Sequence, residues 1–182
     1  MLRITIKADE LFNDNTGEFI EVKEQTLQLE HSLVSLSKWE SKWHKPFLDT
    51  LEKGLLTLDE TIDYIKFMTL TPNVNENVYE FINQSHINEI NKYISDPMTA
   101  TTFSKTNESG SKEIVTAELI YYSMITLNIP FECQKWHLNR LLTLIKVCNI
   151  KSQPPKKMSR SELMSRNAAL NAARRKQLNT KG

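Results

Sequence analysis

The sequence predicts an α+β fold that is mainly α-helical, with a small antiparallel β element, a helical bundle and a basic helical arm. Three observations support this prediction. Apolar and polar residues alternate near the N-terminus, as in half-buried strands. Apolar residues then recur at helical spacing as far as residue 150. A proline pair follows, and beyond it lies a segment rich in alanine and arginine. The expected parts are a globular body (1–150, with β structure at 1–30 and helices at 31–150), a proline-containing linker (151–158) and a basic helical arm (159–182).

Three strands are predicted within residues 1–30. Leu2 to Ile6 alternates apolar and polar residues, which is the period of a strand with one buried face. The turn formers of 13–17 follow, and Gly17 there is free to adopt a positive φ. Residues 19–22 and 26–30 then predict a second and a third strand. We expect a small antiparallel sheet, or a hairpin with one further strand.

Helices are predicted from residue 31 onward. The stripe through Leu33, Leu36, Trp39 or Glu40, and Trp43 predicts a helix over 33–44, which Pro46 should end. Thr57 to Glu60 has the form of a capping box, so a second helix should begin there and close before Thr71-Pro72. A shorter helix is expected from Ser85 to the residue before Asp96-Pro97.

The second half of the body begins with a polar loop at 97–112, for which we expect one short strand at Thr101–Phe103. Thr116 should cap a helix that ends near Asn128, before Pro130. A single long helix is then predicted over 131–149, with an apolar stripe wide enough for burial on more than one side. Cys133 and Cys148 would lie about 22 Å apart along it, too far for a disulfide, so both should be reduced and buried.

The arm differs from the body in charge. Residues 151–182 contain nine basic residues and one acid, a net charge of +8, and because the whole chain carries +1 the preceding residues carry −7. Ser159 to Glu162 forms a second capping box, which should open a helix that reaches about Gln177. Three interpretations stay open: a solvated tail, an arm that docks on an acidic partner or nucleic acid, and an arm that folds back on the acidic body.

Catalytic motifs are not evident in the sequence. With four glycines in the chain there is no Gly-rich phosphate loop, and no serine lies in a nucleophile elbow. We expect the four histidines to be surface or core residues, and acids such as Asp59, Glu60 and Asp63 to favour a helix N-terminus. The predicted protein is therefore no enzyme and has no cofactor and no metal. Without an apolar run of 18 residues or a signal segment, we expect no membrane contact and an intracellular location.

The aromatic residues of 39–47 allow two interpretations. Tryptophans four residues apart share one helical face, so they either pack in the core or anchor a protein interface. The candidate partner-binding residues are four aromatic residues of the body and five basic residues of the arm: Trp39, Trp43, Phe47, Trp136, Arg160, Arg166, Arg174, Arg175 and Lys176.

Two blocks of the sequence are similar to a known family. The runs 27–43 and 45–48, and the runs 136–142, 148–150, 154–159 and 165–171, resemble tail assembly chaperones of long-tailed (siphovirus-type) bacteriophages. The resemblance implies a protein of the infected host cytoplasm that binds the tape measure protein while the tail is built. It implies release before the virion is mature. Tail tube protein and self-association stay open as further partners.

Two other functions compete with this interpretation. A structural virion protein, such as a head–tail connector or baseplate component, is the main alternative. A nucleic-acid-binding protein is less favoured, because the arm has no aromatic residues to stack on bases and the acidic body would repel phosphate.

Overall fold

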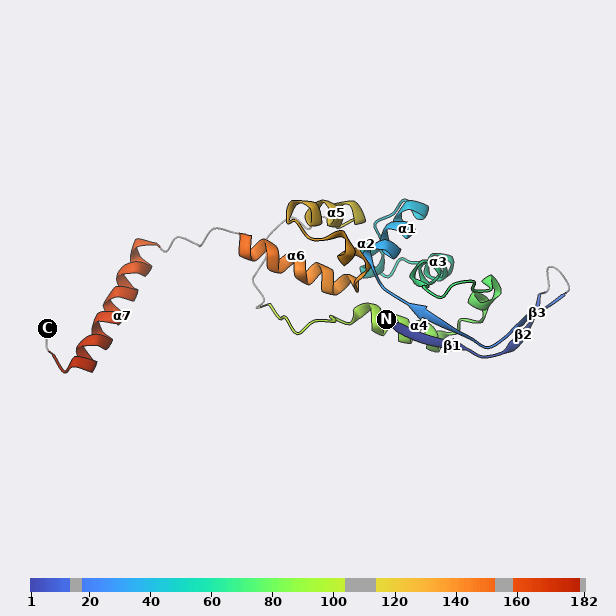
Figure 1. The fold of residues 1–182 in the computed structure, drawn as a ribbon, viewed down its shortest axis with the longest axis horizontal. Helices are drawn as coiled ribbons and strands as arrows, with labels where there is room; N and C mark the ends of the chain where they lie inside the picture. The colour runs from blue at the N-terminus through green and yellow to red at the C-terminus, as the bar shows by residue number, and fades with distance from the viewer. Residues whose placement is uncertain (14–17, 104–113, 153–158, 181–182) are drawn as a thin grey trace. The chain divides into compact units, whose positions relative to one another are not determined.

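The computed structural model describes residues 1–13, 18–103, 114–152 and 159–180. The chain divides into two compact units, Met1–Asn149 and Ile150–Gly182, and each is described by itself. The first unit confirms the predicted class, since an antiparallel β element at the N-terminus is followed by several helices (Figure 1). None of the helices in the described ranges is both long and apolar enough to cross a membrane.

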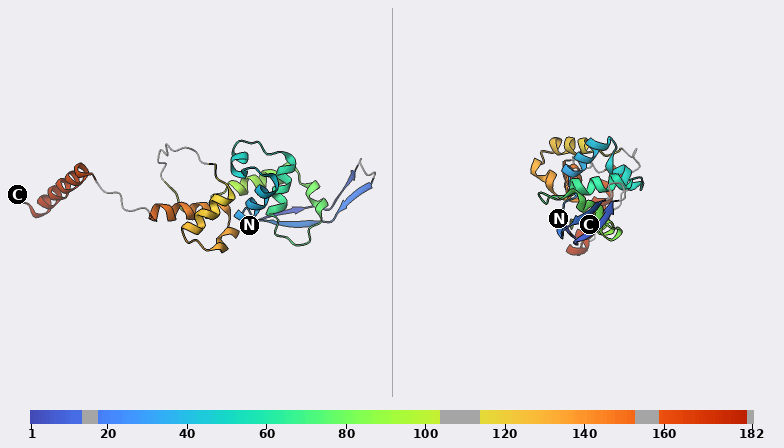
Figure 2. Two further views of the ribbon diagram at one scale, coloured as in Figure 1. Left: turned by 90° about the horizontal axis from the view of Figure 1, so that it is seen from above. Right: turned by 90° about the vertical axis from the view of Figure 1, so that its right-hand side faces the viewer.

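The β element is a long two-stranded ribbon. β1 (Leu2–Ile6) pairs antiparallel with β4 (Gln25–Leu29), and β2 (Asp9–Asn13) pairs antiparallel with β3 (Glu18–Val22). Two views show β2 and β3 continuing the ribbon away from the helices (Figures 1 and 2). Ile4 and Ile6 of β1 and Leu27 and Leu29 of β4 are buried while the residues between them are not, which confirms the predicted alternation. The strand β2 was not predicted, and Asn13, assigned to the turn, pairs with Glu18; residues 14–17 lie outside the described residues.

The helical part of the first unit has eight elements in its described residues. In chain order they are α1 (Leu33–Trp43), α2 (Phe47–Glu52), α3 (Leu58–Met68), the 3-10 helix η1 (Glu76–Phe81), α4 (Gln84–Ser95), α5 (Ala117–Thr126), the 3-10 helix η2 (Phe131–Lys135) and α6 (Leu138–Ser152). α1 packs against α3 on one side and α5 on another, and together with β1 and β4 they enclose the core. Large side chains with 2% exposure or less fill this core, among them Trp39, Phe47, Leu27, Leu33 and Met68.

The prediction for Pro46 was partly wrong. α1 ends at Trp43, and His44 takes a left-handed backbone conformation (φ 53°) that closes it. Pro46 then stands at the N-cap of α2, a helix that was not predicted. Proline tolerates this position because the first amides of a helix have no intrahelical acceptor.

The predicted helix over 131–149 was also wrong. In the structure this segment forms two helices, η2 and α6, and the backbone of Trp136 between them is extended (ψ 164°). The break is fixed by the body: the amide of Leu138 donates to the carbonyl of His31 (2.7 Å), and His137 forms a bridge with Ser32. These long-range bonds replace the helical ones. Cys133, on η2, is buried and Cys148, on α6, is half-buried, and both are free thiols.

Two further expectations in the second half of the body were wrong or only partly met. Thr101–Phe103 is not a strand in the structure, and most of the loop after it lies outside the described residues. On α6 Leu138, Leu141 and Ile145 are buried, and Leu142, Leu144 and Cys148 pack half-buried against the core, so the buried stripe is wide but only three of its residues are fully enclosed.

The predicted arm helix is present. α7 (Arg160–Leu178) begins with the expected capping box, in which the hydroxyl of Ser159 accepts from the amide of Glu162 and the carboxylate of Glu162 accepts from the amide of Ser159. None of its residues is buried. Its helical state therefore depends on local propensity and capping, without support from buried side chains.

Candidate partner-binding surface

The tryptophan pair of α1 is divided between the core and the surface. Trp39 is fully buried (0% exposed), and its indole Nε1 donates a hydrogen bond to the carbonyl of Glu60 (2.9 Å). Phe47 packs edge-on against Trp39, with ring centroids 5.0 Å apart, and stacks on Tyr64 at 3.8 Å. Of the two interpretations, core packing therefore holds for Trp39 and Phe47. Neither side chain is accessible to a partner in the folded body.

Trp43 lies one helical turn further along and is half-buried. Its Nε1 donates to the Asp63 carboxylate (3.1 Å), which also forms an ion pair with Lys42. The Lys42 ammonium lies 5.6 Å from the centre of the Trp43 ring. The indole is therefore held in place by polar contacts while part of its surface stays exposed.

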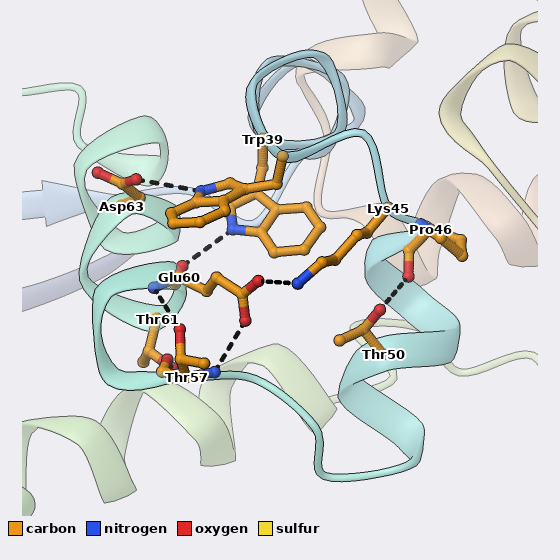
Figure 3. Close-up of polar contacts among 9 residues, drawn as sticks. Trp39, Lys45, Pro46, Thr50, Thr57, Glu60, Thr61 and Asp63 are labelled. Carbon is orange, nitrogen blue, oxygen red and sulfur yellow. Dashed lines mark hydrogen bonds and ion pairs between the residues drawn. The ribbon is translucent and has the colours of Figure 1, made fainter.

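Glu60 joins the start of α3 to the segment after α1 (Figure 3). One carboxylate oxygen accepts from the Thr57 amide (2.8 Å), while the Thr57 hydroxyl accepts from the Glu60 amide, which confirms the predicted capping box. The other oxygen accepts from the Lys45 ammonium (2.6 Å). Lys45 and the Thr57 amide hold the pKa of Glu60 below its usual value. Because α1 and α3 are tied here, the surface between them has a defined shape.

A groove of about 570 Å³ opens beside Trp43, between α1, α3 and η1. Its walls carry four carboxylates and two lysines, a net charge of −2. The apolar surface comes from Trp43, Leu58, Ile62, Tyr79 and Ile82, and Leu58 is 67% exposed. The groove thus combines apolar side chains with a net negative charge in one open site, a combination that suits an amphipathic helix with basic flanks.

The remaining predicted residues do not line this groove. Trp136 stands half-buried between η2 and α6, where the Arg140 guanidinium covers its ring at 4.2 Å. The five basic candidates lie exposed on α7, in the second unit: Arg160, Arg166, Arg174, Arg175 and Lys176. Of the predicted aromatic residues, only Trp43 is in the groove. The exposure of Leu58 was missed, because an apolar residue at the start of an amphipathic helix normally predicts burial.

A buried polar cluster lies elsewhere in the body and was also missed. The rings of His31 and His137 are 5.1 Å apart, and the Tyr64 hydroxyl lies 2.5 Å from Nδ1 of His31. Burial and the neighbouring His137 lower the pKa of His31 to about 3, and burial lowers that of His137 as well. Both imidazoles are therefore neutral near pH 7. Within the described ranges, no three His, Cys, Asp or Glu side chains gather as a metal site would require, so we interpret this cluster as structural.

No family model, no curated protein and no solved structure matches this chain. A function must therefore be inferred from the sequence and from these surfaces.

Proposed function

We propose that the protein is a bacteriophage tail assembly chaperone, which binds the tape measure protein in the host cytoplasm and leaves before the virion is mature. The observation that carries this proposal is the open groove beside Trp43, which is lined by apolar side chains and carries a net charge of −2. Amphipathic helices are commonly bound in apolar grooves through residues at helical spacing. The sequence run that resembles the chaperone family contains Trp43 itself, so the resemblance and the groove point to the same part of the body.

The arm supports a second contact. α7 is exposed along its whole length, and the segment that contains it carries a net charge of +8. A helix without buried residues is ordered at a cost when it binds, and this cost lowers affinity. Such a contact can be released, as a chaperone requires. We propose tail tube protein as the partner of the arm.

Co-expression with the tape measure protein of the same phage tests the proposal. The full chain should keep the tape measure protein soluble and co-purify with it. The Leu58→Ser variant should lose most of this effect, because it removes exposed apolar surface from the groove without touching the core. Leu70→Ser is the matched control, since Leu70 is also exposed (54%) but lies outside the groove.

Two results would count against the proposal. If the wild-type chain left the tape measure protein insoluble, the chaperone function would be wrong. If Leu58→Ser and Leu70→Ser behaved alike, the groove would not be the binding site. Mass spectrometry of purified particles separates a chaperone from a structural virion protein, because only the latter would be present in stoichiometric copies.

A further inference from the structure

The groove between α1, α3 and η1 and the helix α7 have opposite charge. The charged residues that line the groove include the ion pair of Lys42 with Asp63, and the remaining three acids and one lysine leave a net charge of −2. The ion pair of Lys45 with Glu60 beside the groove leaves this balance unchanged. The count for the whole body has the same sign, since residues 1–150 carry −7. α7 has five basic residues and one acid, a net charge of +4.

α7 also carries a short leucine stripe. Leu163 and Leu170 are seven residues apart, so they lie on one face of the helix, and they are 44% and 45% exposed. Arg166 and Arg174 stand beside this stripe, three residues after Leu163 and four residues after Leu170. The chain thus contains a groove that suits an amphipathic helix with basic flanks, and a helix of that kind.

The length of the linker favours the α7 of a second copy as occupant over the α7 of the same chain. α6 runs away from α3 in both ribbon views (Figures 1 and 2), and its 15 residues extend about 22 Å. Residues 153–158, which join α6 to the N-cap of α7, span at most about 24 Å when fully extended. To bring α7 back to the groove within one chain, this linker would have to run extended along nearly the whole of α6. A second copy needs no such extension.

The charges favour an exchange of arms between two copies. Each copy then places its α7 in the groove of the other, so two contacts of opposite charge form in one closed dimer. A contact between two bodies would instead bring together two surfaces of −7, and a contact between two arms would bring together basic helices. The two contacts support each other because they link the same two chains. With only two leucines in the stripe, each contact by itself is weak and can be displaced.

We infer that the groove of one copy holds α7 of a second copy until an amphipathic segment of the tape measure protein displaces it. The displacing partner rests on the proposed function, whereas the contact between the groove and α7 does not. Displacement would free α7 at the moment when the groove is filled. The arm would therefore bind its own partner, proposed above as tail tube protein, only after the tape measure protein is bound.

Sedimentation velocity of the full chain tests the contact. The chain should be a dimer at about 100 μM and a monomer at about 1 μM, so stability measured at the lower concentration reports the body alone. Leu58→Ser in the groove and the double variant Leu163→Ser/Leu170→Ser on α7 should each raise the dissociation constant at least about tenfold. A rise in salt concentration from about 0.05 M to about 0.5 M should weaken the dimer as well, because salt screens the opposite charges.

Matched controls change the same kinds of residue elsewhere. Leu70→Ser replaces an exposed leucine outside the groove, and Met164→Ser/Ala168→Ser replaces two exposed apolar residues of α7 on a face away from the leucine stripe. Both should leave the dissociation constant unchanged. The two double variants lower the helix propensity of α7 to a similar extent, so a difference between them reports the stripe and not the helix.

A photo-crosslinker identifies the occupant of the groove. With p-benzoylphenylalanine in place of Leu58, the chain should cross-link to a peptide from α7, and with the same group in place of Leu70 it should not. A mixture of chains labelled with heavy and with natural isotopes shows whether the cross-link joins two copies. Co-expression with the tape measure protein should strongly reduce this cross-link.

The outcomes separate this inference from the proposed function. A chain that is monomeric at about 100 μM, or a dimer that Leu163→Ser/Leu170→Ser leaves intact, would overturn the contact between the groove and α7. Cross-links confined to single chains would overturn the second copy as occupant. A dimer that behaves as expected, together with a tape measure protein that neither stays soluble nor reduces the cross-link, would overturn the proposed function and leave the exchange of arms supported.

Discussion

One buried carboxylate holds the starts of two helices, and its removal should destabilise both. Glu40 is 8% exposed, and its two oxygens accept from the amides of Phe47 (2.9 Å) and Ala117 (2.7 Å). These amides begin α2 and α5. The N-cap residues of the two helices, Pro46 and Thr116, make no side-chain cap hydrogen bond themselves. The carboxylate of Glu40 thus takes the place of a local N-cap side chain in both helices, and the Ala117 amide that it accepts from is 77 residues away in the sequence.

The expected cost follows from these contacts. Loss of an N-cap costs about 1 kcal/mol on average, and each buried CH₂ contributes about 0.8 kcal/mol. Burial raises the pKa of Glu40, although the amides of Ala117 and Phe47 act in the opposite direction, so its negative charge is itself costly to bury. We therefore expect Glu40→Ala to lower the free energy of unfolding by about 2–4 kcal/mol. Glu40→Gln keeps the packing and one acceptor, so its cost should be about 1–2 kcal/mol.

Urea unfolding followed by tryptophan fluorescence measures these differences. The midpoint should fall in both variants while the m-value stays constant. Hydrogen exchange adds a specific signature, because the amides of Phe47 and Ala117 should lose protection together in Glu40→Ala. Glu89→Ala, an exposed acid of α4, is the control and should change stability by no more than about 0.5 kcal/mol. A cost for Glu40→Ala no larger than that of the control, or a larger cost for Glu40→Gln than for Glu40→Ala, would refute the reasoning.

Three further predictions concern other parts of the chain. The pKa of His31 is about 3 in the folded protein and 6.5 in the unfolded chain. As the pH falls below 6.5, His31 is therefore protonated in the unfolded chain but stays neutral in the folded protein, and the free energy of unfolding decreases. Urea midpoints measured between pH 7 and pH 5 should therefore show a loss of about 2 kcal/mol from His31 alone, and a flat profile would contradict its burial as a neutral ring. In the groove, Trp43→Ala should cost about 1–3 kcal/mol of stability, because it removes the hydrogen bond to Asp63 and the half-buried indole that packs against the core. Leu58→Ser should leave the urea midpoint nearly unchanged, and a large shift would mean that Leu58 packs in the core. Truncation after Ser152 should not lower the unfolding midpoint of the body, because α7 buries no residue, and a clear drop in thermal melts would show that α7 stabilises it.

Local sequence signals predicted the parts of the fold that depend on local chemistry. The capping boxes at Thr57 and Ser159 form as expected, because each needs only residues within one helical turn. The alternation in β1 and β4 likewise identified the buried faces of these strands. Asp96-Pro97 marked the end of α4, since Ser95 is its last residue and Asp96 its C-cap.

Long-range contacts account for the error at 131–149. Helical periodicity continues through 131–149, but the bonds that His137 and Leu138 form with residues 31–32 interrupt the helix there. No window of the sequence contains both partners. The same limit applies to the candidate site. Trp39 and Trp43 are identical in type and share one helical face, yet Trp39 is enclosed by α3 and Phe47 while Trp43 borders a groove. Which tryptophan is accessible depends on α3 and η1, whose positions the sequence pattern does not give.

The groove and the start of α5 have α1 as a common support. Trp43 near its end forms part of the groove, and Glu40, three residues earlier, fixes the start of α5. A change at Glu40 that loosens α5 should therefore lower the free energy of unfolding without an equal loss of binding in the groove, because Trp43 and Asp63 keep their own hydrogen bond. Stability and binding share a support here but depend on separate contacts. That separation lets a loss of binding be assigned to the groove and a loss of stability to the helix starts.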